Sequence, residues 1–170
     1  MALVPWTSRV PLHQQIWNES SDGRRWAFAT VGGVSELTDD EMAFLQGAFD
    51  LARNGDTGRL SEYVDAGVPV NLTNGAGDSL LILAAYHTHL ETVRALLDRG
   101  ADTGRVNDRG QTALAAAVFR RSEPIVRALL AAGADPTAGP KSAVDVAEFF
   151  ELDDMAALLR GESSSTEPQV

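Results

Sequence analysis

Two histidines are the first residues whose type and spacing could do chemistry, because imidazole nitrogens are common metal ligands. His87 and His89 stand two residues apart. Residues with that spacing do not share one face of a helix, and no third ligand completes the pair. The sequence therefore predicts no metal site, and we expect His89 to serve a structural role at a turn.

A glycine-rich stretch and two pairs of acids could support other chemistry. Asn74-Gly75-Ala76-Gly77 could hold a phosphate on backbone amides, but the Lys-Ser/Thr of a phosphate-binding loop does not follow it. The pairs Asp39-Asp40 and Asp153-Asp154 could act as general acids and bases, yet both stand in acidic helical stretches near the ends. We expect a hairpin tip and solvated helix caps here, with no catalytic residue and no cofactor.

The composition excludes several classes of partner. The chain has 170 residues and a net charge of −10, whereas nucleic-acid binding depends on clustered Lys and Arg. No run of apolar residues approaches the roughly 18 needed for a membrane span, and no secretory leader is recognisable. Cys is absent, which is compatible with an intracellular location. The sequence predicts a cytoplasmic protein with no nucleic-acid or membrane partner.

Charge is unevenly distributed along the chain. The segment 86–127 holds seven Arg against five acids, although the chain as a whole is acidic. A solvated helix surface of mixed charge explains this pattern, and so does a basic face that meets a partner with an acidic or mixed surface.

A period of 33 residues is the strongest organisational signal. Gly67, Gly100 and Gly133 keep this interval, and Gly77 and Gly110 repeat it. Apolar residues at helical spacing lie between the two sets of glycines, which predicts two short helices in each unit. Gly100 and Gly133 stand where a helix ends in a left-handed residue, and Ser79 and Thr112 stand where a helix begins. Such units bury both apolar faces only when they stack into a solenoid.

The chain resembles the ankyrin repeat family. The best unit reads Gly110-Gln111-Thr112-Ala113-Leu114, then Ala116-Ala117, then Ile125-Val126-Arg127-Ala128-Leu129-Leu130, and ends in Gly133-Ala134-Asp135. The resemblance implies an all-α solenoid over residues 37–161, with about four helix-turn-helix repeats near 45–73, 74–106, 107–139 and 140–161. The first and last units match weakly, as expected of capping repeats.

Several positions depart from the family pattern. The Pro of the helix entry is replaced by Leu80, Ala113 and Ala143, and the His at the helix start by Ile82, Ala115 and Asp145. We expect the polar network attributed to that His to be absent, so that the units depend more on packing. The turn Gly is replaced by Thr88 and Arg121, and a side chain in that turn should cost stability.

The resemblance implies that a protein partner binds to a concave surface built from hairpin tips and the ends of the first helices. The two positions after the Ala-Ala pair give Arg53-Asn54, Tyr86-His87, Phe119-Arg120 and Phe149-Phe150 when the four units are aligned. Aromatic residues and Arg are enriched at binding hot spots, so these pairs are the candidate site. The alternative is that the rings pack between repeats as core, and Phe149 in particular could be covered by the terminal cap. Hairpin residues could extend the site, namely Gly75, Ala76, Asp78, Asp108, Arg109 and Gln111.

The two ends of the chain fall outside the repeats. Residues 1–36 hold all three Trp, and Ile16-Trp17 and Trp26-Ala27-Phe28 flank a polar turn, which predicts a β-hairpin. This extension could cap the solenoid, meet a partner, or be a fused segment. The polar tail, residues 162–170, is predicted to be disordered.

The functional prediction is a non-catalytic protein–protein interaction module. It would act as a monomer that presents its concave surface to an unidentified protein, as an accessory or regulatory subunit of an enzyme. Two alternatives remain open: an enzyme that uses concave-face carboxylates or His, and a structural scaffold without a specific partner.

Overall fold

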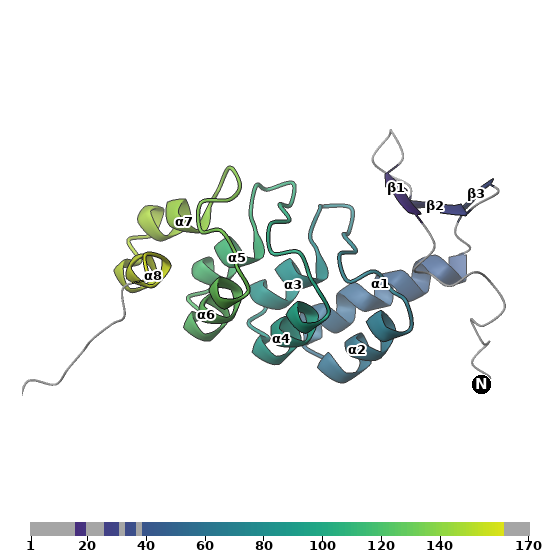
Figure 1. Cartoon of the computed structure of the whole chain (residues 1–170), viewed down its shortest axis with the longest axis horizontal. Helices are drawn as coiled ribbons and strands as arrows, with labels where there is room; N and C mark the ends of the chain where they lie inside the picture. The colour runs from purple at the N-terminus through teal and green to yellow at the C-terminus, as the bar shows by residue number, and fades with distance from the viewer. Residues whose placement is uncertain (1–15, 20–25, 31–32, 37–38, 162–170) are drawn as a thin grey trace, which may run out of the picture.

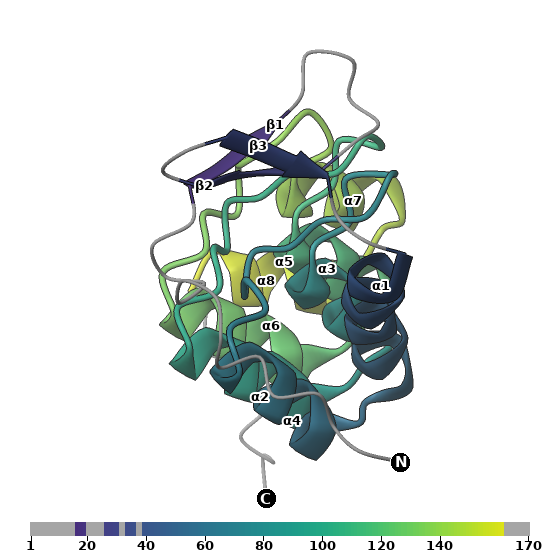
Figure 2. The ribbon, with the colours of Figure 1, turned by 90° about the vertical axis from the view of Figure 1, so that its right-hand side faces the viewer.

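The computed structural model describes residues 16–19, 26–30, 33–36 and 39–161, and Figure 1 shows their arrangement. Four helix pairs follow one another along the described chain: α1 (Asp39–Asn54) with α2 (Thr57–Asp65), α3 (Leu80–Tyr86) with α4 (Leu90–Asp98), α5 (Ala113–Phe119) with α6 (Glu123–Ala131), and α7 (Ala143–Phe149) with α8 (Asp153–Leu159). The first helices of the pairs form one layer and the second helices form the other (Figures 1 and 2). The predicted all-α repeat solenoid is confirmed.

The first helices of the two middle units form the centre of the core. All residues from Leu80 to Ala85 in α3 and from Ala113 to Val118 in α5 are buried. The many Ala residues allow the first helices to approach closely, and each of α3 and α5 packs against the first helix on either side of it. Side chains remain exposed only at the last residue of each of these two helices, Tyr86 and Phe119.

Hydroxyl groups begin α3, α5 and α7, and two of them, Ser79 and Thr112, were predicted from the sequence. The Oγ of Ser79 accepts a hydrogen bond from the backbone N–H of Ile82 at 3.1 Å, and Thr112 and Ser142 cap α5 and α7 in the same way. Each of these bonds satisfies a backbone donor that the first turn of a helix leaves without a partner. At the helix exits, Gly100 and Gly133 have φ values of 81° and 85°, which confirms the predicted left-handed ends.

The turn between the two helices of each unit is left-handed, with or without a glycine. Gly55 has a φ of 72° in the first unit, and the equivalent residues Thr88, Arg121 and Glu151 have φ values of 63°, 54° and 53°. A residue with a Cβ pays about 1 kcal/mol or more to adopt this conformation. The left-handed conformation expected from the sequence at Thr88 and Arg121 is therefore present, and it extends to Glu151.

Replacing Thr88 by glycine is expected to stabilise the protein, because glycine adopts positive φ without the steric penalty of a Cβ. We expect the free energy of unfolding to rise by about 0.5–1 kcal/mol, measured by urea denaturation. Arg127→Gly is the contrasting variant, since Arg127 lies within α6, where glycine should lower stability by about 1 kcal/mol. A loss of stability in Thr88→Gly would contradict the argument.

The end units differ from the middle ones in ways that suit caps. Helix α1 has 16 residues, whereas the other first helices have 7. In the last unit the exposed Glu148 stands where the third unit has the fully buried Val118, so the outer side of α7 is more polar. Ser142 and Asp145 form a capping box at the start of α7, and these hydrogen bonds lower the pKa of the Asp145 carboxyl.

Three short strands precede the helices: β1 (Ile16–Glu19), β2 (Trp26–Thr30) and β3 (Gly33–Glu36). They form an antiparallel sheet in the order β1-β2-β3, with Trp17 opposite Phe28 in the first pair and Ala29 opposite Val34 in the second. The first pair is the hairpin expected from the sequence, and β3 was not expected. The predicted disorder of residues 162–170 lies outside the described residues, and the three interpretations of residues 1–36 stay predictions.

Candidate protein-binding surface

The candidate residues lie at one structural position that is repeated along the solenoid. Each pair stands at the end of a first helix, immediately before the left-handed turn residue. The turn directs the chain back toward the second helix, so the residue before it stays at the rim of the helix pair. The alignment made from the sequence therefore describes equivalent places in the structure.

Four aromatic side chains at these positions form one continuous cluster, which we call the ring ladder: Tyr86, Phe119, Phe149 and Phe150. The rings of Tyr86 and Phe119 stack with their centroids 6.1 Å apart. Phe150 packs edge-on against Phe119 at 5.4 Å and against Phe149 at 4.9 Å. The ladder therefore joins the second, third and fourth units.

The rings of the ladder are exposed to a degree that core packing does not explain. Tyr86 and Phe119 are each 38% exposed and Phe150 is 45% exposed. Phe149 is 81% exposed, so the expectation that the terminal cap could cover it is wrong. Leu152, Met155, Leu158 and Leu159 in and beside α8 are buried in the core, and Phe149 is not part of that packing. Large exposed apolar patches are a feature of interaction sites, and the binding role of these rings stays a prediction.

Cationic and imidazole groups accompany the first half of the ladder. The guanidinium of Arg120 lies over the ring of Tyr86, 5.4 Å from its centroid. The ring of His87 lies 5.4 Å from that of Tyr86 and 6.3 Å from that of His89. Partial burial lowers the pKa of His87, and repulsion from His89, Arg53 and Arg120 lowers it further. His87 is therefore mainly neutral at pH 7.

The first pair, Arg53 and Asn54, has no aromatic ring and is not part of the ring ladder. Arg53 forms an ion pair with Asp50 at 2.7 Å, and its backbone carbonyl accepts a hydrogen bond from Nε2 of His89, also at 2.7 Å. This bond ties the second unit to the first and confirms the structural role expected of His89. Asn54 is exposed at the end of α1.

The hairpin residues divide into a buried group and an exposed group. Asp78 was expected on the binding surface, but it is buried and carries a polar network, so that expectation is wrong. Its carboxylate accepts hydrogen bonds from Nδ2 of Asn107 at 2.7 Å and from the guanidinium of Arg109 at 3.0 Å. Gly75, Ala76, Asp108 and Arg109 are exposed, and Gln111 is half-buried.

This network was not predicted from the sequence, from which we expected only that the network attributed to the helix-start His should be absent. Asn107 is only 5% exposed, and its Oδ1 accepts from the backbone N–H groups of Arg109 and Gln111. Asn74 makes the same kind of contacts in the preceding hairpin, to the N–H groups of Ala76 and Asp78. The signal was the 33-residue interval between Asn74 and Asn107, which the 33-residue glycine period could have revealed.

The Arg-rich middle segment is largely neutralised within the chain. Five of its seven Arg form ion pairs, namely Arg94 with Glu91, Arg99 with Asp65, Arg105 with Asp102, Arg109 with Asp78 and Arg127 with Glu123. Arg120 and Arg121 have no carboxylate partner among the described residues. The basic character is therefore concentrated beside the ring ladder rather than spread over the segment.

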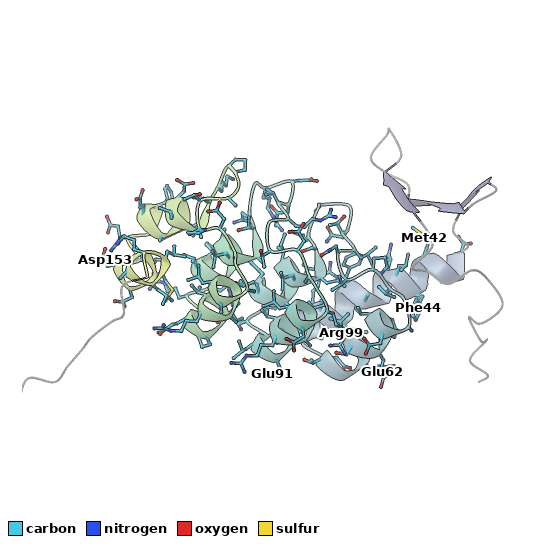
Figure 3. The ribbon with its side chains drawn as sticks, viewed as in Figure 1. Met42, Phe44, Glu62, Glu91, Arg99 and Asp153 are labelled. Atoms are coloured by element: carbon cyan, nitrogen blue, oxygen red, sulfur yellow. The ribbon has the colours of Figure 1, made fainter. Side chains whose placement is uncertain are left out.

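A shallow groove lies at the other end of the surface, between α1 and the first hairpin. Its volume is about 180 Å³, and its apolar lining comes from Met42, Leu45, Phe49 and Leu72 (Met42 is labelled in Figure 3). Asp50 is the carboxylate among its lining residues, and its ion pair with Arg53 holds it in place. Among the residues described, no three His, Cys, Asp or Glu side chains are grouped so that they could hold a metal ion.

The acid pairs weighed as catalysts lie at the ends of the array. Asp39 is the first residue of α1, and Asp153 and Asp154 begin α8, all with exposed side chains. The side chain of Asp40 lies outside the described residues. Of the helices in the described part of the chain, none is long and apolar enough to cross a membrane.

Comparison with known proteins identifies the architecture. A family model described as ankyrin repeats in three copies matches residues 49–139, which is more than half of the chain. A curated protein of Pseudomonas aeruginosa, named as an ankyrin repeat protein, is 49% identical over 59 residues. That match covers 35% of this chain and 34% of the relative, so the chain spans about a third of the relative's length. With its helix pairs, left-handed turns and 33-residue period, the chain belongs to the ankyrin repeat family.

Proposed function

We propose that the protein is a non-catalytic interaction module that binds a protein partner through the ring ladder. Ankyrin repeats are in general protein–protein interaction modules. The finer proposal is that a single chain acts in the cytoplasm as an accessory or regulatory subunit of an enzyme, with the ladder on its concave surface. The observation that carries it is the exposed, continuous cluster of Tyr86, Phe119, Phe149 and Phe150 across three units.

The ladder suits binding because its side chains are held before any partner arrives. The buried helices α3 and α5 fix the backbone under Tyr86 and Phe119, and ring-to-ring contacts restrict the side chains. The side chains of this surface therefore lose little conformational entropy when a partner binds. Arg53, Asn54, His87, Arg109, Gln111 and Arg120 would contribute polar contacts around the rings.

The triple variant Tyr86→Ala/Phe119→Ala/Arg120→Ala tests the proposal. We expect it to capture the native partner at least tenfold less efficiently than wild type in a pull-down from the source organism, because each residue has the character of a hot spot. The matched control is Glu91→Ala/Arg94→Ala/Arg127→Ala, which changes three exposed side chains on α4 and α6 (Glu91 is labelled in Figure 3).

Circular dichroism of all three proteins separates lost binding from lost folding. Undiminished capture by a folded triple variant would show that the ring ladder is not the surface used. Equal loss in the control would point to the second helices instead.

A further inference from the structure

In the third and fourth units, the residue after the first ladder ring contacts the ring of the unit before it. In the third unit this residue is Arg120, whose guanidinium lies over Tyr86 of the second unit. In the fourth unit the same position is occupied by Phe150, whose ring packs on Phe119 of the third unit at 5.4 Å. Equivalent residues of two consecutive units thus make the same kind of contact with the preceding unit, with a guanidinium in one case and an aromatic ring in the other.

Phe149 is the next ring in this series, and the described chain has no further unit to cover it. Its recorded ring contact is with Phe150, and 81% of its surface stays exposed. Burying a ring of this size is worth about 2 kcal/mol or more, so a partner that covered Phe149 would gain binding free energy. The last described unit therefore presents an aromatic face without the contact that Tyr86 and Phe119 receive from the following unit.

The charged residues next to these two rings along the chain are acidic. Glu148 and Glu151 flank the two rings along the chain, and Asp153 and Asp154 follow at the start of α8, all four with exposed side chains. Among the described residues, no Lys, Arg or His forms an ion pair with any of them. Residues 162–170 contain no Lys or Arg.

We propose that Phe149 and Phe150 receive an arginine side chain from a basic segment of the partner protein. A guanidinium over Phe149 would repeat the contact that Arg120 makes with Tyr86, and it would pair with the carboxylates of Glu148 or Glu151. Arginine fits better than lysine, because its planar guanidinium stacks on a ring and also binds carboxylates. This inference rests on the proposed function, since it names the chemistry of the partner at one end of the same ladder.

The binding of a short labelled peptide of alternating Arg and Gly to the full chain tests this site. We expect fluorescence anisotropy to show tighter binding of this peptide than of the matching peptide of citrulline and Gly, which keeps the shape without the charge. Phe149→Leu keeps an apolar side chain but removes the ring, and should weaken binding about threefold to fivefold. Glu148→Gln/Glu151→Gln removes the two charges that flank the rings along the chain and should weaken it by a similar factor.

The matched control is Glu62→Gln/Asp98→Asn, which gives the same net charge as the Glu148/Glu151 variant. Glu62 lies on α2, at the opposite end of the array from Asp153 (Figure 3), and Asp98 ends α4. This control should bind the arginine peptide as wild type does. Amide chemical shifts in wild type should change mainly over residues 148–154 on titration.

Three results would overturn the inference: no preference for the arginine peptide, unchanged binding by folded Phe149→Leu, or equal weakening in the control. The last would mean attraction to an acidic protein as a whole. These outcomes are distinct from failure of the proposed function, which the pull-down with the Tyr86/Phe119/Arg120 variant reports. If the partner bound to the ring ladder but placed no arginine on Phe149, the proposed function would stand and this inference would be wrong.

Discussion

Replacing Gly55 by alanine is expected to lower the free energy of unfolding by about 3 kcal/mol. Gly55 has a φ of +72°, which alone costs an alanine about 1 kcal/mol. The added Cβ would also lie 2.4 Å from Nδ1 of His89, and the ring must move to relieve that contact. Moving it breaks the hydrogen bond from Nε2 of His89 to the carbonyl of Arg53, worth a further 1 kcal/mol or so, and crowding adds the rest.

Two other glycines separate these contributions. Gly100 also has a positive φ, but nothing lies within 4 Å of its Cβ position, so Gly100→Ala should cost only about 1 kcal/mol. Gly75 has neither a positive φ nor a neighbour within 4 Å, so Gly75→Ala should change stability by less than about 0.5 kcal/mol. Urea denaturation of the three variants gives the comparison. Equal losses for Gly55→Ala and Gly100→Ala would show that the contact with His89 has no weight.

Asp78→Ala should have the second large effect, a loss of about 2–3 kcal/mol. The Asp78 carboxylate is nearly inaccessible and accepts from the Asn107 amide at 2.7 Å and from Arg109 at 3.0 and 3.2 Å. Its removal leaves the buried amide of Asn107 without that acceptor, and a buried unsatisfied donor costs about 1–3 kcal/mol. The bonds from Asn107 and Arg109 to Asp78 also join two consecutive hairpins, so their loss should loosen the contact between units.

The neighbouring carboxylate Asp108 is the matched control. It lies in the next hairpin with an exposed side chain, and its backbone N–H, which bonds to the carbonyl of Ala76, is retained on substitution. Asp108→Ala should stay within about 0.5 kcal/mol of wild type in thermal or urea unfolding. If Asp78→Ala and Asp108→Ala lowered the free energy of unfolding by equally small amounts, the network between the hairpins would not contribute to stability.

The parts of the fold that depend on one unit could be predicted from the sequence. Ser79 begins a helix and Gly100 ends one because of bonds and torsions within a few residues, and repetition every 33 residues reinforces each signal. The positions of Tyr86 and Phe119 follow in the same way, because the left-handed turn comes one residue after each pair. The binding role of these residues stays a prediction.

The parts that depend on neighbouring units could not be predicted. Asp78 resembles a solvent-exposed hairpin residue until the next hairpin is placed beside it and supplies Asn107 and Arg109 from about one repeat further along the chain. Phe149 resembles a residue that α8 would cover, and its exposure is decided by the end of the array rather than by local pattern. The ion pairs of the Arg-rich middle segment favour the mixed-charge surface, one of the two interpretations of the sequence, but the pair of Arg99 with Asp65 joins neighbouring units and could not be seen within one unit.

The ring ladder contains residues from three repeats, so it is complete only when all three repeats are folded and stacked. If the terminal unit frayed, Phe149 and Phe150 would leave together and the ring of Phe119 would lose its cover. In a linear array of repeats the end units unfold locally most readily. A partner that contacts all four rings of the ladder therefore binds only the form in which every unit is folded and stacked. The free energy of partner binding would then stabilise the folded form of the last repeat. A substitution of a buried residue in α8 would lower the affinity for the partner even though no surface residue is changed.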